Sequence, residues 1–188
     1  IIAMSLTPTT SIPLGFNAPS FILTDVISGA KLSYSDVRGE KGTLVMFICN
    51  HCPYVIHVRS ELILLANDYL KKGVGFVAIS SNDVVNYPDD APERMKELAL
   101  KEKFPFPYLY DESQEIAKEY NAACTPDFML FDENELCVYR GRLDESRPNS
   151  GVPVTGKDMR AAINMMTQGK EMTLPQYPSM GCNIKWKR

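Results

Sequence analysis

The sequence has no long hydrophobic run and no long cluster of charges of one sign. None of its apolar stretches approaches the ~18–20 residues that a membrane-spanning helix needs. The 20 Lys and Arg residues against 23 Asp and Glu give a formal net charge of -3, without the basic stripe typical of proteins that bind nucleic acids. We therefore expect neither a membrane nor a nucleic acid as the partner of this protein.

Cysteine is scarce, and its number is odd. The five cysteines are irregularly spaced, which argues against the disulfide framework of a small secreted protein. At 188 residues the chain is long enough to bury a hydrophobic core without such cross-links. A reducing compartment fits this cysteine usage best, so the expected location is cytoplasmic.

Hydrophobic patterns alternate between those of strands and those of helices. Short apolar or alternating runs predict strands at residues 21–26, 31–37, 43–48, 74–79, 108–110, 127–131 and 136–140. Apolar residues spaced three and four apart, together with capping signals, predict helices at residues 53–72, 90–103, 113–120 and 156–169. Asp90 is the expected N-cap of the second of these helices, because Glu93 can complete a capping box with it.

This order of elements predicts an α/β fold. We expect a central mixed β-sheet flanked by helices, with a β-hairpin of the first two strands as an N-terminal extension. No internal repeat, low-complexity tract or linker divides the sequence, so residues 1–188 are expected to form a single domain. Residues 170–188 contain two prolines and no clear period, and we expect an irregular C-terminal tail there.

The segment Cys49-Asn50-His51-Cys52-Pro53 lies where a predicted buried strand meets a helix. Proline is favoured at the first helical position, which places Cys52 at the N-cap. There its sulfur faces unpaired backbone N–H groups and the positive end of the helix dipole, and both favour a thiolate. We therefore expect a lowered pKa for Cys52, which would make it a nucleophile. The neighbouring His51 could add a positive charge.

Two cysteines separated by two residues have two chemical interpretations. Near a β-α-β pattern in a reducing compartment, Cys49 and Cys52 indicate a redox motif. The alternative is half of a metal site, but zinc requires about four ligands, and only His51 and His57 lie nearby in the sequence. Redox chemistry without a metal or a cofactor is the favoured interpretation. Binding of a soft metal ion by the two cysteines and a histidine is the alternative.

Several motifs resemble those of a known superfamily. Residues 43–58 look like the active-site segment of the thioredoxin superfamily. Residues 15–25 are similar to the G-x-x-A-P-x-F-x-L-x-D opening of its redoxin or AhpC/TSA-like branch, and residues 124–128 look like the loop that carries the superfamily's cis-proline. The N-H-C-P-Y segment and residues 181–186 resemble a peroxiredoxin-like group within that superfamily. The resemblance covers nearly the whole chain and implies a thioredoxin-like fold.

The resemblance also implies roles for single residues. An ungapped match to the thioredoxin strand makes Cys52 the nucleophile, whereas a shifted match makes Cys49 the nucleophile and Cys52 its resolving partner. We prefer the first match, because the second puts Pro53 where the first N–H bond of the helix should form. The bond between Thr125 and Pro126 is expected to be cis, which would leave backbone groups open for pairing with an extended substrate segment.

A second thiol must release the mixed disulfide that such a nucleophile forms. Cys49 is nearest to Cys52 in the sequence, and we rank it first. Cys124, next to the expected cis bond, is ranked second. Cys182, in the expected C-terminal tail, is ranked third. Cys137 falls in the middle of a predicted hairpin and is expected to be a core residue.

Two features of the superfamily are missing. The buried aspartate that assists the second cysteine of thioredoxin would align with Met46. The peroxiredoxin signature P-x-x-x-T-x-x-C is absent around Cys49 and Cys52, and its peroxidatic cysteine would align with Val55. These departures weaken the case for an efficient peroxidase of that mechanism.

We therefore expect an oxidoreductase, and more specifically a thiol–disulfide oxidoreductase. Its substrate would be a disulfide-containing protein or a small thiol compound, and a reducing partner would regenerate the enzyme. A thiol peroxidase with antioxidant activity is one alternative. A metal-binding or copper-delivery module is an alternative of another class.

Overall fold

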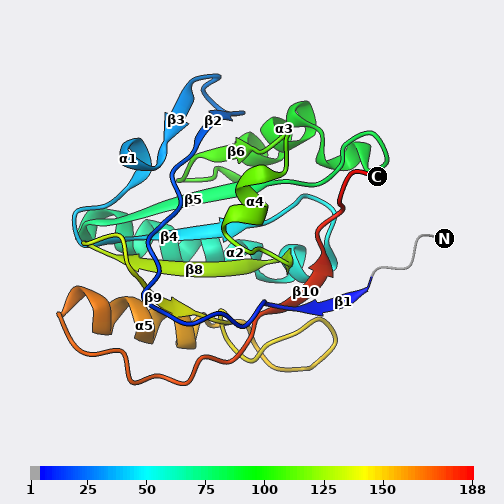
Figure 1. Ribbon diagram of the computed structural model, residues 1–188. Coiled ribbons are helices and arrows are strands. Elements are labelled where there is room, and N and C mark those ends of the chain that lie inside the picture. Colours follow the sequence, from blue (N-terminus) through cyan, green and yellow to red (C-terminus); the bar gives the residue numbers. More distant parts are fainter. Residues whose placement is uncertain (1–4) are drawn as a thin grey trace.

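The computed structural model describes residues 5–188 of the chain as a mixed β-sheet with helices on both faces (Figure 1). Within these residues, seven strands form the main sheet in the order β3-β2-β6-β5-β4-β8-β9. Its strands are β2 (Ile22–Asp25), β3 (Lys31–Ser33), β4 (Gly42–Phe47), β5 (Val74–Ser80), β6 (Tyr108–Tyr110), β8 (Asp127–Asp132) and β9 (Cys137–Arg140). The helices are α1 (Tyr34–Val37), α2 (Pro53–Tyr69), α3 (Pro92–Glu102), α4 (Glu115–Glu119) and α5 (Lys157–Thr167).

The pairing of the strands confirms the predicted mixed sheet. Strands β4, β5 and β6 run parallel to one another, whereas β8 pairs antiparallel with β4, and β9 pairs antiparallel with β8. The expected N-terminal hairpin is confirmed as β2 and β3, and β2 joins the sheet by antiparallel pairing with β6. The central strands β4 and β5 are buried along their whole length, as their continuous apolar sequences predict.

Alternate side chains of β4 serve two separate layers of the core. Leu44 and Met46 lie in the layer that contains residues of α2, α3 and α5. Val45 and Phe47 lie in the layer that contains residues of α1 and α4. This division follows from the two-residue period of a strand, which sends neighbouring side chains to opposite faces of the sheet. Strands β5 and β8 pair with β4 up to its last residue, Phe47. The segment that carries Cys49 and Cys52 begins directly after it.

The chain leaves the predicted pattern after β3. A strand was expected to continue to Val37, but residues 34–37 form the short helix α1. The cause is a capping box, because the Asp36 carboxylate accepts hydrogen bonds from the backbone N–H of Ser33 (2.8 Å) and from its hydroxyl (2.7 Å).

The C-terminal segment also differs from the prediction. Instead of being irregular throughout, residues 170–188 include the strand β10 (Met180–Asn183). This strand lies between β1 (Leu6–Pro8) and β7 (Cys124–Thr125) in a second, three-stranded sheet, antiparallel to both. Figure 1 shows β10 beside β1, near the N-terminal end of α2. Strands from near both ends of the described chain, β1 and β10, therefore form one sheet with β7, which leads into the loop that contains Pro126.

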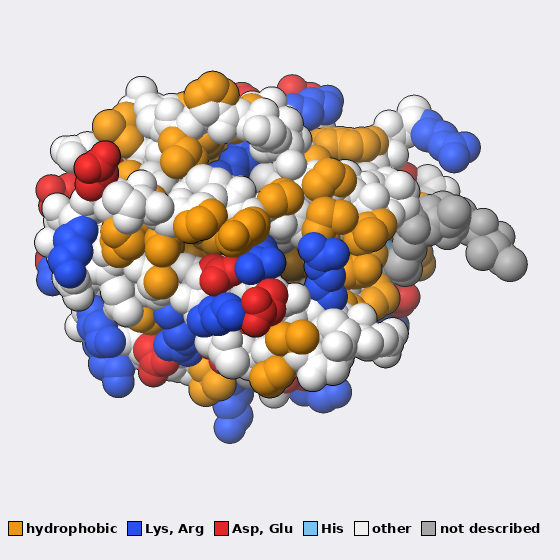
Figure 2. Space-filling view, turned by 90° about the horizontal axis from the view of Figure 1, so that it is seen from below, with side chains coloured by type: hydrophobic (Ala, Val, Ile, Leu, Met, Phe, Trp, Pro, Cys, Tyr) orange, Lys and Arg blue, Asp and Glu red, His pale blue; other side chains and the backbone are white. Residues whose placement is uncertain are grey.

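Figure 2 shows the face of the molecule on which α5 lies, where acidic and basic side chains stand next to one another among hydrophobic ones. Ion pairs hold α5 to the segment before it: Arg142 contacts Asp158 at 2.7 Å, and Lys157 contacts Glu145 at 2.6 Å. Among residues 5–188, no helix is both long enough and apolar enough to cross a membrane.

The packing of α2 against the sheet can be tested with two leucines of the same helix. Leu62 is fully buried, whereas Leu64 is 56% exposed. We expect Leu62→Ala to lower the free energy of unfolding by about 2–5 kcal/mol, because it leaves a cavity in the core. The control Leu64→Ala should change it by about 0.5 kcal/mol or less. Urea denaturation measures both, and equal effects of the two substitutions would contradict this packing.

Candidate active site at the start of α2

Cys52 is the N-cap residue of α2, and Pro53 is the first residue of that helix. This is the position that the proline predicts, since a missing N–H costs nothing in the first turn. The carbonyl of Cys52 accepts the N–H groups of Val55 (3.0 Å) and Ile56 (2.9 Å), which begins the helix. The sulfur of Cys52 is thus fixed at the mouth of α2.

The Cys52 sulfur meets the loop that contains the predicted cis-proline. The Thr125–Pro126 bond is cis, which confirms the expectation. The Cys52 Sγ lies 3.2 Å from the carbonyl oxygen of Thr125, within hydrogen-bonding reach of its thiol. The structure therefore brings together Cys52, Thr125 and Pro126, three of the residues that the sequence singles out.

Two further cysteines reach the same place. The Sγ atom of Cys182, on β10, is 2.8 Å from the Sγ atom of Cys52. Cys49 lies just after β4, and its Sγ atom is 3.4 Å from the hydroxyl oxygen of Thr125. All three side chains are at most 3% exposed. The sequence placed Cys182 last among the candidate partners, because the strand that carries it was not foreseen.

These contacts decide how the three thiols ionise. Hydrogen bonds from Cys182 and Cys49 lower the pKa of Cys52 far below its ordinary value, even though burial opposes the shift. The backbone N–H of Val55 in the first turn of α2 lowers the pKa of Cys52 as well, in agreement with the expected effect of the helix start. The same sulfur–sulfur contacts, followed by burial, raise the pKa of Cys182 and of Cys49. These contacts therefore favour the thiolate form at Cys52 and the thiol form at Cys182 and Cys49.

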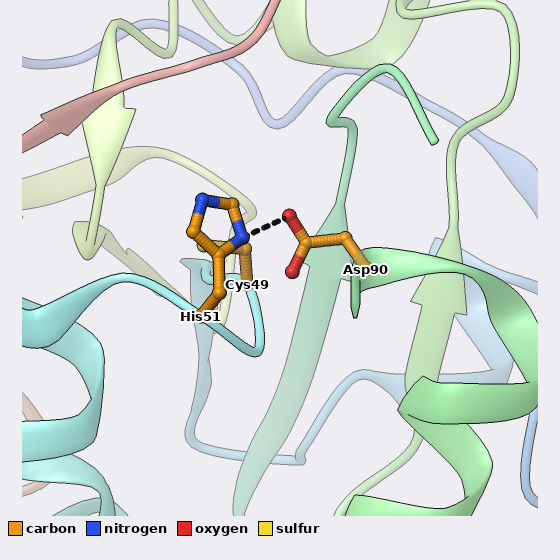
Figure 3. Close-up of side chains that lie close together, drawn as sticks. All are labelled: Cys49, His51 and Asp90. Carbon is orange, nitrogen blue, oxygen red and sulfur yellow. Dashed lines mark ion pairs between the residues drawn. The ribbon is translucent and has the colours of Figure 1, made fainter. Parts of the chain in front are cut away.

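An ion pair lies on the other side of Cys49. Nδ1 of His51 is 2.6 Å from Oδ2 of Asp90, as Figure 3 shows. Asp90 is completely buried, and its other oxygen accepts the backbone N–H of Asn50 at 2.8 Å. The hydrogen bond to Asp90 raises the pKa of His51, against the effect of burial. His51 thus keeps a positive charge close to the thiols to a higher pH than an isolated imidazole would.

Asp90 is the site residue whose role the sequence misjudged. It was expected to cap the following helix, but Ala91 is the N-cap of α3, and Asp90 ends a short 3-10 helix (Pro88–Asp90). Its carboxylate instead accepts hydrogen bonds from Asn50 and from the side chain of Asn82 (2.8 Å), in addition to its contact with His51. A buried carboxylate needs such partners, and these come from distant parts of the chain. In the sequence, the only signal was an acidic residue that also fits a capping pattern.

Cys49, His51 and Asp90 also have the composition of a metal site, with ligand atoms that all lie within 4.8 Å of one another. Figure 3 shows the three side chains converging from the end of β4 and from the segment before α3. However, Asp90 already accepts hydrogen bonds from Asn50 and Asn82. A metal ion would have to compete with these bonds and with the contact between His51 and Asp90.

The remaining cysteines do not join the cluster. Cys124 precedes the cis bond, but its thiol reaches the carbonyl oxygen of Pro126 at 3.6 Å, and burial raises its pKa. Cys137 lies in the core layer beneath α1 and α4, as expected, and burial raises its pKa to about 12. His57 contacts the hydroxyl of Ser146 at 2.7 Å.

Residues 14–140, more than half of the chain, match the AhpC/TSA family. The chain belongs to this family. The AhpC/TSA chain is also similar to a curated protein, the thiol-disulfide oxidoreductase ResA of Geobacillus kaustophilus (strain HTA426). The two are 30% identical over 131 residues, which are 68% of each protein. The family and this relative support oxidoreductase activity.

Solved structures confirm the thioredoxin-like fold of the AhpC/TSA chain. An uncharacterized conserved protein from Geobacillus kaustophilus is 55% identical, with a TM-score of 0.97 over 99% of this chain and 98% of that one. A hypothetical protein from Sinorhizobium meliloti 1021 is 42% identical, with a TM-score of 0.94 over 96% of this chain and 98% of that one. Solved thioredoxin and thiol–disulfide oxidoreductase structures of lower identity share the fold.

The ion pair beside Cys49 makes a prediction about pH. The substitution Asp90→Asn should lower the pKa of His51, because a neutral amide does not stabilise the imidazolium as the carboxylate does. In the unsubstituted protein the raised pKa of His51 stabilises the fold fully below the unfolded value of 6.5, and this contribution is lost as the pH rises through the folded pKa. Titration of the His51 ring signals by NMR measures the shift.

The control for this titration is Asp89→Asn, which removes the neighbouring exposed carboxylate. That carboxylate makes no contact with His51 in the described part of the chain, where the ion pair is made by Asp90. An unchanged His51 titration in Asp90→Asn, or an equal change in Asp89→Asn, would contradict the arrangement.

Proposed function

We propose that this protein is a thiol–disulfide oxidoreductase in which Cys52 is the nucleophile. The observation that carries the proposal is the position of the Cys52 sulfur. It lies at the N-cap of a helix, 3.2 Å from the carbonyl oxygen that precedes the cis-proline and 2.8 Å from a second cysteine sulfur. Thiol–disulfide exchange requires a thiolate and a nearby second sulfur, and the site provides both.

The contacts of Cys52 support its role as the attacking atom. Attack on a disulfide uses the thiolate form, and the contacts with Cys182 and Cys49 favour that form at neutral pH by lowering the pKa of Cys52. When Cys52 becomes part of a mixed disulfide, it loses its charge. The contact that raises the pKa of Cys182 is then lost too, so the second thiol becomes easier to ionise at the moment when it must attack.

The ion pair of His51 and Asp90 places charged groups near the thiols, whereas β4 has no charged residue at the position of the assisting aspartate of thioredoxin. The position expected to hold an assisting aspartate is occupied by the fully buried Met46. A protonated His51 attracts the Cys52 thiolate, and Asp90 keeps the imidazole protonated. Besides the contact with Cys52 and burial, the charge of Asp90 raises the pKa of Cys49, so Cys49 stays a thiol. In this proposal His51 acts on the thiols through its charge, and Asp90 positions His51.

Reduction of a peroxide is the second candidate, because the AhpC/TSA family matches this chain and because the site is enclosed. A cavity of about 30 Å³ beside the cis-proline, lined by Tyr54, Pro126 and Met180 among others, has room for about one water molecule. Stopped-flow reaction with hydrogen peroxide distinguishes the two activities: a rate no greater than that of an ordinary thiol would exclude the peroxidase.

Metal delivery is the weaker candidate, although Cys49, His51 and Asp90 lie close enough together to share an ion. The existing hydrogen bonds of Asp90 would oppose it. We place disulfide exchange first because three thiols converge on one position, whereas the potential metal ligands already have partners.

The proposal predicts that Cys52→Ser abolishes disulfide reduction. With a small disulfide and a dithiol reductant, the rate should fall by at least about 100-fold, because a serine hydroxyl is not ionised at neutral pH. The matched control is Cys137→Ser, which also replaces a buried thiol but lies in the other core layer and should keep most of the rate. A Cys52→Ser protein that folds and keeps its rate would overturn the assignment of the nucleophile.

A further inference from the structure

Strand β10 pairs with the backbone of β7, just before the cis-proline, where the sequence predicted that an extended substrate segment would pair. It pairs antiparallel with β7, and Cys182 is opposite Thr125, the residue that precedes the cis bond. The approach is so close that only glycine fits at the preceding position. A Cβ atom on Gly181 would lie 1.9 Å from the carbonyl oxygen of Thr125. The edge of β7 is therefore already occupied by a segment of the same chain.

Cys182, the cysteine of this strand, lies next to Cys52, in the position that a substrate cysteine would have to reach for disulfide exchange. Its Sγ atom is 2.8 Å from the Sγ atom of Cys52, and a disulfide bond of about 2.05 Å needs only a small further approach. Cys52 is completely buried beneath these contacts. An extended peptide cannot bring its own cysteine to Cys52 along β7 while Cys182 is there.

The segment that contains β10 is fastened on both sides of Cys182. Before it, the hydroxyl of Ser179 donates to the carbonyl oxygen of Pro126 at 2.7 Å. After it, the backbone N–H of Lys185 donates to the Asn82 side chain at 2.8 Å, and the carbonyl of Lys185 accepts the N–H of Asp83 at 2.8 Å. Removing the strand would break all of these bonds, whereas joining the two sulfurs breaks none of them.

We propose that Cys182 is the second redox sulfur and that its disulfide with Cys52 is the oxidised form of the protein. By pairing with β7, β10 occupies the position that an extended substrate segment would take, and it thereby closes the site to such segments. The outside substrate is then a small disulfide. This inference rests on the proposed disulfide exchange and names its second sulfur and its substrate class. The cavity beside Tyr54, Pro126 and Met180 has room for about one water molecule, and none of the three cysteines lines it. Entry of a small disulfide by this route therefore requires the flexible, partly exposed Met180 side chain to move while the backbone of β10 stays in place.

The reaction balances without a further component. The Cys52 thiolate attacks one sulfur of the small disulfide, forms a mixed disulfide and releases the first substrate thiolate, which takes up a proton. Cys182 then loses its proton and attacks the Cys52 sulfur, which releases the second substrate thiol. The substrate disulfide is reduced to two thiols while Cys52 and Cys182 are oxidised, and an external dithiol restores both.

The first test is to map the disulfide of the oxidised protein. The full-length chain is treated with glutathione disulfide, remaining thiols are blocked, and the peptides are identified by mass spectrometry. We expect a Cys52–Cys182 linkage, and we expect Cys182→Ser to accumulate the mixed disulfide of Cys52 with glutathione. A Cys49–Cys52 linkage in the unsubstituted protein would overturn the inference and leave the proposed disulfide exchange intact.

The second test opens the groove without removing a sulfur. Gly181→Ala should push β10 away from Thr125, so that reduction of insulin, whose disulfides lie in extended protein segments, rises by about tenfold or more relative to reduction of glutathione disulfide. The control is Thr7→Ala on β1, the other neighbour of β10, where the hydroxyl donates, among residues 5–188, to the nearby carbonyl of Ser5 alone. It should leave the ratio of the two rates unchanged.

The outcomes of this test separate the two claims. If the unsubstituted protein reduces insulin as well as Gly181→Ala does, β10 does not close the site, and the inference fails. If it reduces neither disulfide, the proposed function itself fails. Urea denaturation of Gly181→Ala confirms that the variant is folded before its rates are compared.

Discussion

The contact between the sulfur atoms of Cys52 and Cys182 is the interaction on which the rest of the site depends. It places two thiols 2.8 Å apart and lowers the pKa of one while it raises the pKa of the other. A buried thiolate without donors would be costly, because the charge has left water. Hydrogen bonds from two thiols and from a backbone N–H in the first turn of α2 offset this cost for Cys52. They explain how a fully buried sulfur can remain reactive.

The same contact links β1 and β10, which come from near opposite ends of the described chain, to the centre of the fold. Cys182 reaches Cys52 only because β10 is held between β1 and β7, and β7 is part of the cis-proline loop. The buried Asp127, which follows that loop, accepts hydrogen bonds from the hydroxyl of Thr9 (3.0 Å) and the backbone N–H of Ala123 (3.2 Å). Residues far apart in the sequence thus fix the position of the Cys182 sulfur. We regard the burial of Cys52 as a consequence of this strand pairing and of these hydrogen bonds.

The sequence predicted the parts of the site that depend on local rules. Pro53 marks the first position of a helix, so Cys52 could be assigned to the N-cap, and the motif around Pro126 indicated the cis bond. The central strands could be recognised because β4 and β5 are buried on both faces and therefore have continuous apolar sequences. Cys182 was underestimated, because β10 is short and irregular in pattern and exists only through pairing with distant strands. Asp90 was misassigned for a related reason: a local capping pattern was overridden by hydrogen bonds from distant residues.

The ionisation of Cys52 tests this account most directly. Thiolates absorb ultraviolet light more strongly than thiols, so the absorbance of the reduced protein, minus that of Cys52→Ser, can be followed as the pH is varied. This reports the ionisation of a buried sulfur without a reagent that must reach it. We predict that the difference signal is already fully present at neutral pH and is lost only in acid, below the ordinary cysteine pKa of about 8.5. A difference signal that rises only above that value would show that Cys52 is an ordinary buried thiol and would contradict the account.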